Sequence, residues 1–196
     1  MIETKRKGAK SIKDIPKDIL EQLNHGEIET ANLVEWLAVD QRILLENLLE
    51  QHDRKKYLKP ILTHIDGLKK QTVNTINEAI GTGLFEQTAI HNDSDSFPII
   101  STHQSDFVRA WAAYTIGKNT TLNIKEMLRK IQPFAADRHF GVREVAWFAV
   151  RPSIAQYLEE SITILSKWTA NETKTLDVLQ VKRQDLAAFG ANISKN

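Results

Sequence analysis

The sequence predicts an all-α fold in which antiparallel helix pairs stack into an α-solenoid. Apolar residues recur at spacings of three and four along most of the chain, and the β-branched residues are scattered rather than gathered into strands. The carboxy-terminal half also contains an internal repeat, because "SDFVRAWAAYTIG" and "RHFGVREVAWFAV" both carry Val-Arg followed by Ala at the same spacing. Val108 and Val142 are 34 residues apart, a period typical of proteins with two helices per unit.

The amino-terminal half predicts a series of short helices. We expect residues 1–13 to be disordered and "KDIPKDILEQLNHGE" to form a helix, with Pro16 near its first turn and Gly26 as its stop. The stretch "ETANLVEWLAVDQRILLENLLEQ" predicts either two helices or one long bent helix. The segments "KKYLKPILTHIDG" and "LKKQTVNTINEAIGTG" predict further helices, each closed by glycine. Residues 91–98, "HNDSDSFP", predict the loop that separates the two halves.

The composition restricts the class of protein. Of the 196 residues 41% are hydrophobic and 26% are charged, which fits a folded soluble domain. The net charge is +1, so any contact with DNA must come from a local basic patch. The absence of Cys excludes disulfides and thiolate metal sites. No apolar run approaches the roughly 18 residues of a membrane span. We therefore expect a cytoplasmic protein that does not enter a membrane.

Three segments carry a more specific likeness. "KGAKSIKDIPKDILEQLNHGEIETANLVEWLAVD", "VRAWAAYTIG" and "IQPFAADRHFGVREVAWFAVRP" resemble the bacterial DNA alkylation repair family of HEAT-like-repeat DNA glycosylases, and are most similar to its AlkC-type branch, related to AlkD. The resemblance covers residues 7–174 and departs from the family at Val145, where a Trp is expected. It implies a HEAT-like helical domain over residues 14–174. It also implies a monomeric, cofactor-free glycosylase that excises N3- and N7-alkyl purines from double-stranded DNA.

The last residues, 175–196, depart from this family. The resemblance implies a third unit of the type N-V-R-R-F-A-S-E-A-T-R-P-R-G-V-W at this point. Codons that are permitted for Asp177–Ser194, read in a shifted frame, give R-R-F-A-S-E-A-T-R-P-R-G-V-W-G-K-H-I. We therefore interpret the tail as an out-of-frame translation that starts near Lys174. We expect such a chain to be less stable than an intact relative, with reduced or no glycosylase activity.

The family's chemistry requires an aromatic face for a cationic base, a carboxylate that stabilises an oxocarbenium-like transition state, and cations for the phosphates. Trp36 and Asp40 are four residues apart and would share one helix face. In the alternative interpretation Trp36 belongs to the core and Asp40 is a cap or a bridge. The resemblance makes Glu144 the first catalytic candidate, with Trp147 beside it. A pair between Arg143 and Glu144 that links repeat units is the structural alternative, and Trp147 could equally be a packing residue.

The candidates for DNA contact are arginines of the repeat, one Trp and two lysine pairs. They are Arg109, Trp111, Arg143, Arg151, Lys55, Lys56, Lys69 and Lys70. The arginines suit a ladder that follows a phosphate backbone, although hydrogen bonds between repeats explain them equally well. Trp111 at helical spacing could be a packing residue, and the lysines could form a solvated face.

Two functions are compatible with these patterns. The first is a monofunctional DNA glycosylase whose activity is impaired by the altered tail. The alternative is a non-catalytic HEAT-repeat module that binds DNA or another protein, since one fold hosts many functions. No HExxH, phosphate-loop or nucleophile-elbow pattern occurs, and His139 is expected only as a helix-start residue.

Overall fold

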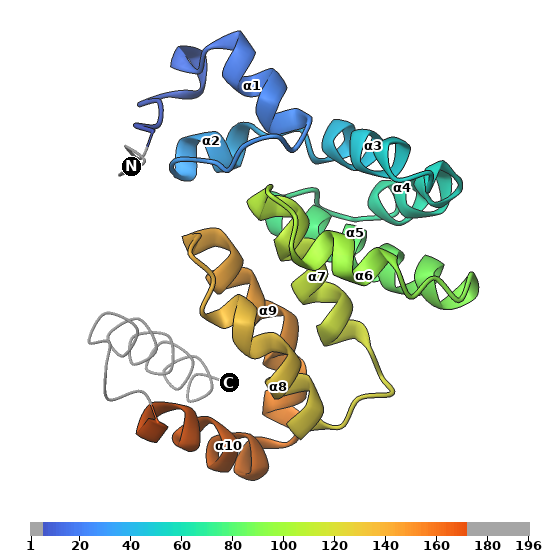
Figure 1. The fold of residues 1–196 in the computed structure, drawn as a ribbon, viewed down its shortest axis with the longest axis vertical. Helices are drawn as coiled ribbons and strands as arrows, with labels where there is room; N and C mark the ends of the chain where they lie inside the picture. Colours follow the sequence, from blue (N-terminus) through green and yellow to red (C-terminus); the bar gives the residue numbers. More distant parts are fainter. Residues whose placement is uncertain (1–5, 172–196) are drawn as a thin grey trace.

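A computed structural model describes residues 6–171, and all regular secondary structure in this range is helical (Figure 1). The all-α prediction is therefore confirmed for this part of the chain. The helices are the 3₁₀ turns η1 (Ile12–Asp14) and η2 (Lys55–Tyr57), and α1 (Lys17–Asn24), α2 (Leu33–Ala38), α3 (Gln41–Gln51), α4 (Leu58–Asp66), α5 (Val73–Ile90), α6 (Ser96–Ser101), α7 (Asp106–Lys118), α8 (Ile124–Ala135), α9 (Phe140–Gln156) and α10 (Leu158–Asn171). The tail at residues 175–196, and with it the question of its reading frame, lies outside the described residues. None of the helices within residues 6–171 has both the length and the apolar composition that crossing a bilayer requires.

Residues 6–13 do not fit the disorder predicted for residues 1–13. The guanidinium of Arg6 donates two hydrogen bonds of 2.6 Å to the carboxylate of Glu35 on α2. Asn32 Nδ2 donates a hydrogen bond of 2.8 Å to the carbonyl of Ala9. A side chain at Gly8 would collide with Asn32, so the absence of a Cβ lets this segment lie close to α2. The basic amino-terminal segment is thus held against the first helices. The contacts of residues 1–5 fall outside the described range.

Residues 29–51, for which the sequence predicts either two helices or one long bent helix, form two helices. The Asn32 side chain caps α2 by accepting the amide of Glu35 at 3.0 Å. Val39 has an extended backbone with ψ of 126°, which ends α2. Asp40 then caps α3 by accepting the amides of Arg42 and Ile43. The first helix also ends as predicted, at Gly26 with φ of 73°.

Glycine has a different role in α5 from the predicted one. Helix α4 ends at Gly67, but α5 continues through Gly81 and Gly83 to Ile90. A Cβ at Gly81 would lie 2.9 Å from the carbonyl oxygen of Trp111, and a Cβ at Gly83 would lie 2.7 Å from Ile61 Cγ1. The glycines therefore allow neighbouring helices to approach α5 and do not stop it. The predicted loop is shorter at its end, because α6 begins at Ser96.

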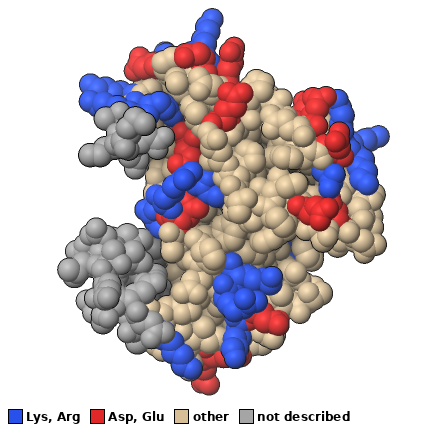
Figure 2. Space-filling view, in the orientation of Figure 1, with Lys and Arg blue, Asp and Glu red and all other residues tan. Residues whose placement is uncertain are grey.

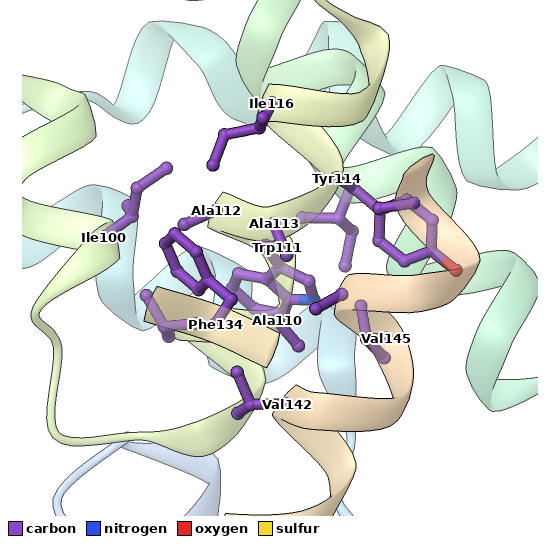
Figure 3. Close-up of a cluster of buried hydrophobic side chains, with 14 of the residues drawn as sticks. Ile100, Ala110, Trp111, Ala112, Ala113, Tyr114, Ile116, Phe134, Val142 and Val145 are labelled. Carbon is purple, nitrogen blue, oxygen red and sulfur yellow. The ribbon is translucent and has the colours of Figure 1, made fainter. Parts of the chain in front are cut away.

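Helix α7 is the centre of the molecule. It packs most extensively against α9 on one side and α5 on the other, and it also contacts α6 and α8 (Figure 1). Every side chain from Asp106 to Ile116 is buried. Figure 3 shows Trp111 and the neighbouring alanines of α7 among Ile100, Phe134 and Val142. The small side chains of α7 let the surrounding helices come close, so one continuous core connects the two halves of the sequence.

The two copies of the sequence repeat have the same local geometry. Arg109 Nη1 donates to the carbonyl oxygens of the residues six and five positions earlier, both at 2.8 Å. Arg143 Nη1 donates to the corresponding carbonyl oxygens at 2.8 and 3.1 Å. The residue six positions before each arginine also accepts the amide of the helix cap, at 3.0 Å in the first copy and 2.8 Å in the second. The Val-Arg motif therefore marks the start of α7 and of α9 by the same hydrogen bonds.

Candidate functional site

One exposed stripe of α9 carries the residues that are best placed for chemistry. Glu144, Phe148 and Arg151 follow at helical spacing and are all exposed, with Phe148 keeping 39% of its accessible surface. The opposite face of α9 buries Val142 and Val145 against the core. Because the buried face fixes how the helix is rotated, the three exposed side chains project from α9 on one side.

A shallow pocket of about 250 Å³ lies beside this stripe. Its walls come from α5, α7 and α9, the three helices that pack side by side. The lining residues are Asn74, Thr75, Glu78, Tyr114, Phe148, Arg151 and Pro152. The pocket therefore combines two aromatic rings, a carboxylate, a guanidinium and small polar groups.

Burial and two carboxylates affect the pKa of Tyr114. Burial raises the pKa of Tyr114, and the negative charges of Glu78 and Glu144 raise it further. The phenol is therefore neutral at physiological pH and able to donate its proton in a hydrogen bond. Glu78 also forms an ion pair of 2.5 Å with Lys118. Within residues 6–171 Glu144 forms no ion pair or hydrogen bond, and in particular it does not pair with Arg143. Glu144 thus keeps an exposed carboxylate on the same stripe of α9 as Phe148 and Arg151, outside the residues that line the pocket.

The predicted pairing of Trp36 with Asp40 is wrong in its geometry. The two residues do not share a helix, because α2 ends at Ala38 and Asp40 caps the next helix. Trp36 is 5% exposed, and its ring stacks on Phe107 with 4.0 Å between the ring centroids. The structure therefore gives Trp36 a place in the core and Asp40 a place at a helix cap, which is the alternative interpretation of this motif.

Trp147 contacts Trp168 on α10 and does not line the pocket on α9. It is half-buried, and its ring centroid lies 6.3 Å from that of Trp168 on α10, with the rings tilted by 43°. This contact joins α9 to α10, which is a packing role.

The first two residues proposed to contact DNA are occupied within the protein. Arg109 is 6% exposed and forms ion pairs with Glu29 and Asp137. Trp111 has no exposed surface, and its Nε1 donates a hydrogen bond of 2.8 Å to Asn77 Oδ1. These contacts support the interpretation that hydrogen bonding and packing between repeats select these residue types. Arg143 is partly buried by its carbonyl contacts, whereas Arg151 is exposed and lines the pocket.

The four lysines proposed for DNA contact lie on the surface. Lys55 forms an ion pair of 2.9 Å with Glu50, and Lys56 lies over the Tyr57 ring at 5.6 Å. Lys69 and Lys70 are exposed in the connection between α4 and α5. The structure does not bring these lysines into the lining of the pocket on α9.

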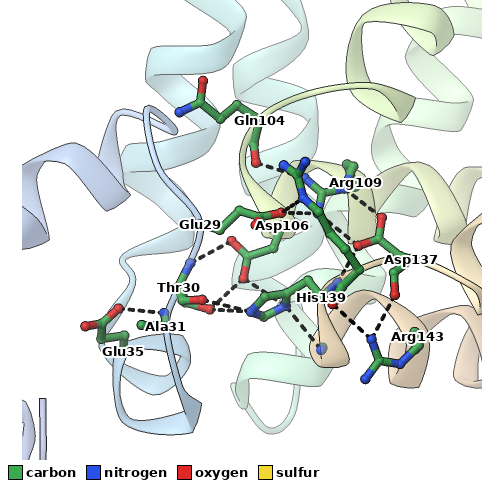
Figure 4. Close-up of polar contacts among 12 residues, drawn as sticks. Glu29, Thr30, Ala31, Glu35, Gln104, Asp106, Arg109, Asp137, His139 and Arg143 are labelled. Atoms are coloured by element: carbon green, nitrogen blue, oxygen red, sulfur yellow. Dashed lines mark hydrogen bonds and ion pairs between the residues drawn. The ribbon is translucent and has the colours of Figure 1, made fainter. Parts of the chain in front are cut away.

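A buried polar network ties the segment around Thr30 to α7 and α9 (Figure 4). Thr30 donates its amide and its hydroxyl to the carboxylate of Asp106, at 3.2 and 2.6 Å. His139 Nδ1 lies 3.3 Å from Asp106 Oδ2, and its Nε2 lies 2.9 Å from the carbonyl oxygen of Thr30. Burial raises the pKa of Asp106, while His139 and the hydrogen bonds from Thr30 lower it in part. His139 caps α9, as expected from its place in the sequence.

The network and the pocket differ in what they can do chemically. Every group of the network is satisfied inside the protein, so it can position helices but leaves no open face for a ligand. The pocket on α9 is open to solvent and combines the exposed ring of Phe148 with the carboxylate of Glu78, which suits a flat or cationic group. No set of three or more His, Asp or Glu side chains between residues 6 and 171 is arranged to hold a metal ion.

Sequence patterns identified only part of this pocket. Among its lining residues Arg151 is a sequence candidate, and the candidate Glu144 lies on the same stripe of α9, whereas Glu78, Tyr114 and Phe148 are not candidates. The spacing of Glu144, Phe148 and Arg151 at four and three residues is a signal that could have added Phe148. No comparable signal places Glu78 beside Tyr114, because their proximity depends on how α5 packs on α7.

Protein-family models, curated proteins and solved structures were compared with this chain, and none of them matches it.

Proposed function

We propose that this chain is a member of the bacterial DNA alkylation repair family, with a HEAT-like-repeat fold and the activity, impaired by the altered tail, of a monofunctional DNA glycosylase on N3- and N7-alkyl purines. Its partner is double-stranded DNA that contains alkylated bases. The repeated arginine geometry, 34 residues apart at the starts of α7 and α9, supports a repeat architecture. Consecutive pairs of packed helices, α4 with α5, α6 with α7 and α8 with α9, support the α-solenoid arrangement.

The pocket on α9 is the observation that carries the activity. Alkylation at N3 or N7 gives the purine a positive charge, which the exposed ring of Phe148 attracts. Loss of the base leaves positive charge on the sugar, and a carboxylate close by stabilises that charge. Glu144 is suited to this role because it is exposed, acts on Tyr114 and has no ion-pair partner among residues 6–171. Arg151 at the same pocket suits a phosphate of the same strand.

The test measures base release and DNA binding separately. A duplex that carries one N7-methylguanine is incubated with an excess of the full chain, and the released base is quantified. We expect Glu144→Gln to reduce the rate of release at least 100-fold. This corresponds to a loss of about 2.7 kcal/mol of transition-state stabilisation, which is typical for removal of one electrostatic group. Its affinity for the duplex should change little. Glu160→Gln, an exposed carboxylate on α10, is the matched control and should leave the rate unchanged.

A non-catalytic HEAT-repeat module that binds DNA or another protein is the second candidate. It is favoured by the fact that Trp36, Asp40, Arg109 and Trp111 all have structural roles. In that case the chain binds the duplex but releases no base above the rate of a sample without protein. Substitutions of basic residues would then be the only ones with an effect. Equal base release by the chain and by its Glu144→Gln variant would contradict the proposed role of Glu144.

A further inference from the structure

We propose that residues 6–17 form a second DNA contact, a lysine-bearing segment that binds the phosphates of the duplex beside the lesion. This inference rests on the proposed function for the identity of its partner. The segment is named here the amino-terminal arm. It carries Lys7, Lys10, Lys13 and Lys17, against a single acidic residue, Asp14.

The arm is held in place by a buried anchor. The Glu35 side chain is 1% exposed and receives both terminal nitrogens of Arg6, at 2.6 Å each. Arg6 Nη2 also donates to the carbonyl of Glu29 at 3.0 Å. Hydrogen bonds from Arg6 and from the amide of Ala31 lower the pKa of Glu35 and outweigh the effect of burial, so the carboxylate is charged at neutral pH. A bidentate pair of this kind fixes the position of the chain as well as its charge.

The lysines of the arm have no competing partner. Within residues 6–171 none of the four forms an ion pair or a hydrogen bond, and all four are exposed. Two nearby acidic groups are already engaged, since Asp14 accepts the hydroxyl of Ser11 and Glu29 pairs with Arg109 and Arg138. Asp18, beside Lys17, forms no ion pair within residues 6–171 and offsets one positive charge. Figure 2 shows basic side chains at this amino-terminal end of the molecule, with acidic side chains beside them. The arm thus presents a local positive surface on a chain whose net charge is only +1.

The place of the arm relative to the pocket favours a long polyanion. Trp36 follows Glu35 in α2 and lies against the first residues of α9, with its ring centroid 6.1 Å from that of Phe140. The pocket begins at Phe148 of the same helix. The rise from Phe140 to Phe148 is about 12 Å along the axis of α9. A DNA duplex carries one negative charge per about 1.7 Å of its axis, so a duplex on the pocket has several phosphates along this length of α9. A single small anion could not span both positions.

The experiment compares two triple variants of the full chain. Lys7→Gln/Lys10→Gln/Lys13→Gln removes three charges from the arm. Lys125→Gln/Arg129→Gln/Lys130→Gln removes three exposed charges from α8. Binding to an unmodified 20-base-pair duplex is followed by fluorescence anisotropy between 50 and 200 mM NaCl. Each lost phosphate contact lowers the slope of log affinity against log salt by about 0.9.

We expect the arm variant to bind about tenfold more weakly at the lower salt and to lose roughly two to three units of slope. The α8 variant should bind like the unmodified chain. An unchanged slope in the arm variant, or an equal loss in the α8 variant, would overturn the proposal. Because the duplex is undamaged, this result does not depend on base release. Failure of the glycosylase proposal would appear separately, as absence of base release by a chain that still binds through the arm.

Discussion

Trp111 Nε1 donates a hydrogen bond of 2.8 Å to Asn77 Oδ1, and the two residues are 34 positions apart, one period of the repeat. Both side chains have no exposed surface. Helices α5 and α7 are therefore joined in the core by a directional polar contact as well as by apolar packing. The bond exists only when the two helices have the correct register, so it favours one arrangement of the pair over its neighbours.

This hydrogen bond predicts how much stability the protein loses when Trp111 is replaced by a smaller residue. Trp111→Phe leaves Asn77 Oδ1 without its donor and removes part of a fully buried ring, so the free energy of unfolding should fall by about 3 kcal/mol. Urea denaturation followed by circular dichroism gives this value. Trp147→Phe, at a half-buried position, is the control and should cost less than about 1 kcal/mol. Equal losses in the two variants would contradict the role given to the Trp111 hydrogen bond.

Close approach of α7 and α9 predicts a strong effect at Gly117. A Cβ at this position would collide with the carbonyl oxygen of Ala149, which is backbone and cannot move aside alone. Gly117→Ala should therefore lower the free energy of unfolding by about 3 kcal/mol or prevent folding. Gly67→Ala is the matched control, because its new Cβ would lie 3.5 Å from the nearest atom. A Gly117→Ala protein with the urea midpoint of the Gly67→Ala protein would refute this account of the helix contact.

His103 predicts how stability depends on pH. Burial lowers the pKa of His103 to about 4, and the charges of His52 and Arg109 lower it further. Between this value and the ordinary value of about 6.5 the unfolded chain binds a proton that the folded chain does not. Stability from this group is therefore complete above pH 6.5 and is lost as pH falls toward 4, by up to about 1.4 kcal/mol per pH unit.

The variant His103→Asn tests this dependence. Its side-chain oxygen can replace His103 Nδ1 as the acceptor of the Ser105 amide, which lies 3.0 Å away. Urea denaturation between pH 4 and 7 should show a smaller loss of stability in the variant than in the unmodified chain. Gln104→Asn, an exposed and uncharged neighbour, should keep the original profile. Parallel profiles for His103→Asn and the unmodified chain would exclude His103 as the source.

Phe148 predicts a preference for positive charge in the pocket. Phe148→Leu keeps an apolar side chain but removes the π face, which is worth about 1–2 kcal/mol toward a cation. Affinity for a duplex with N7-methylguanine, relative to the unmodified duplex, should therefore fall by about 5- to 30-fold. Anisotropy titrations with both duplexes give this ratio. Phe140→Leu, another exposed aromatic residue of α9, should leave the ratio unchanged if the pocket alone reads the lesion.

Local patterns predicted most of the helices but not their packing. The stop at Gly26, the caps at Asn32 and Asp40 and the start of α9 at His139 follow from short-range chemistry that is visible in the sequence. Gly81 looked like another stop, yet it is an interior residue. Its role depends on the carbonyl of Trp111, which is 30 residues further on in the chain. A contact at that separation leaves no signal in the local pattern.

The candidate site shows the same division. Glu144 and Arg151 could be found because they lie in one repeated motif, whereas Tyr114 and Glu78 belong to the pocket only through the packing of three helices. Trp36 shows how a plausible pattern can mislead. Its spacing from Asp40 fits a shared helix face, but the extended residue Val39 separates the two helices. The conformation of one residue therefore decides whether two side chains can cooperate.

The bond between Thr30 and His139 has a consequence for the order of folding. The two residues are 109 positions apart, and the contact also requires Asp106. During synthesis the segment around Thr30 leaves the ribosome long before Asp106 and His139 have been made. Until then its amide and hydroxyl form hydrogen bonds to water. Contacts between residues so far apart in the chain form late and slowly, because the entropy cost of closing a large loop comes before the contacts that offset it. The amino-terminal helices can thus reach their final places only after α9 has been made.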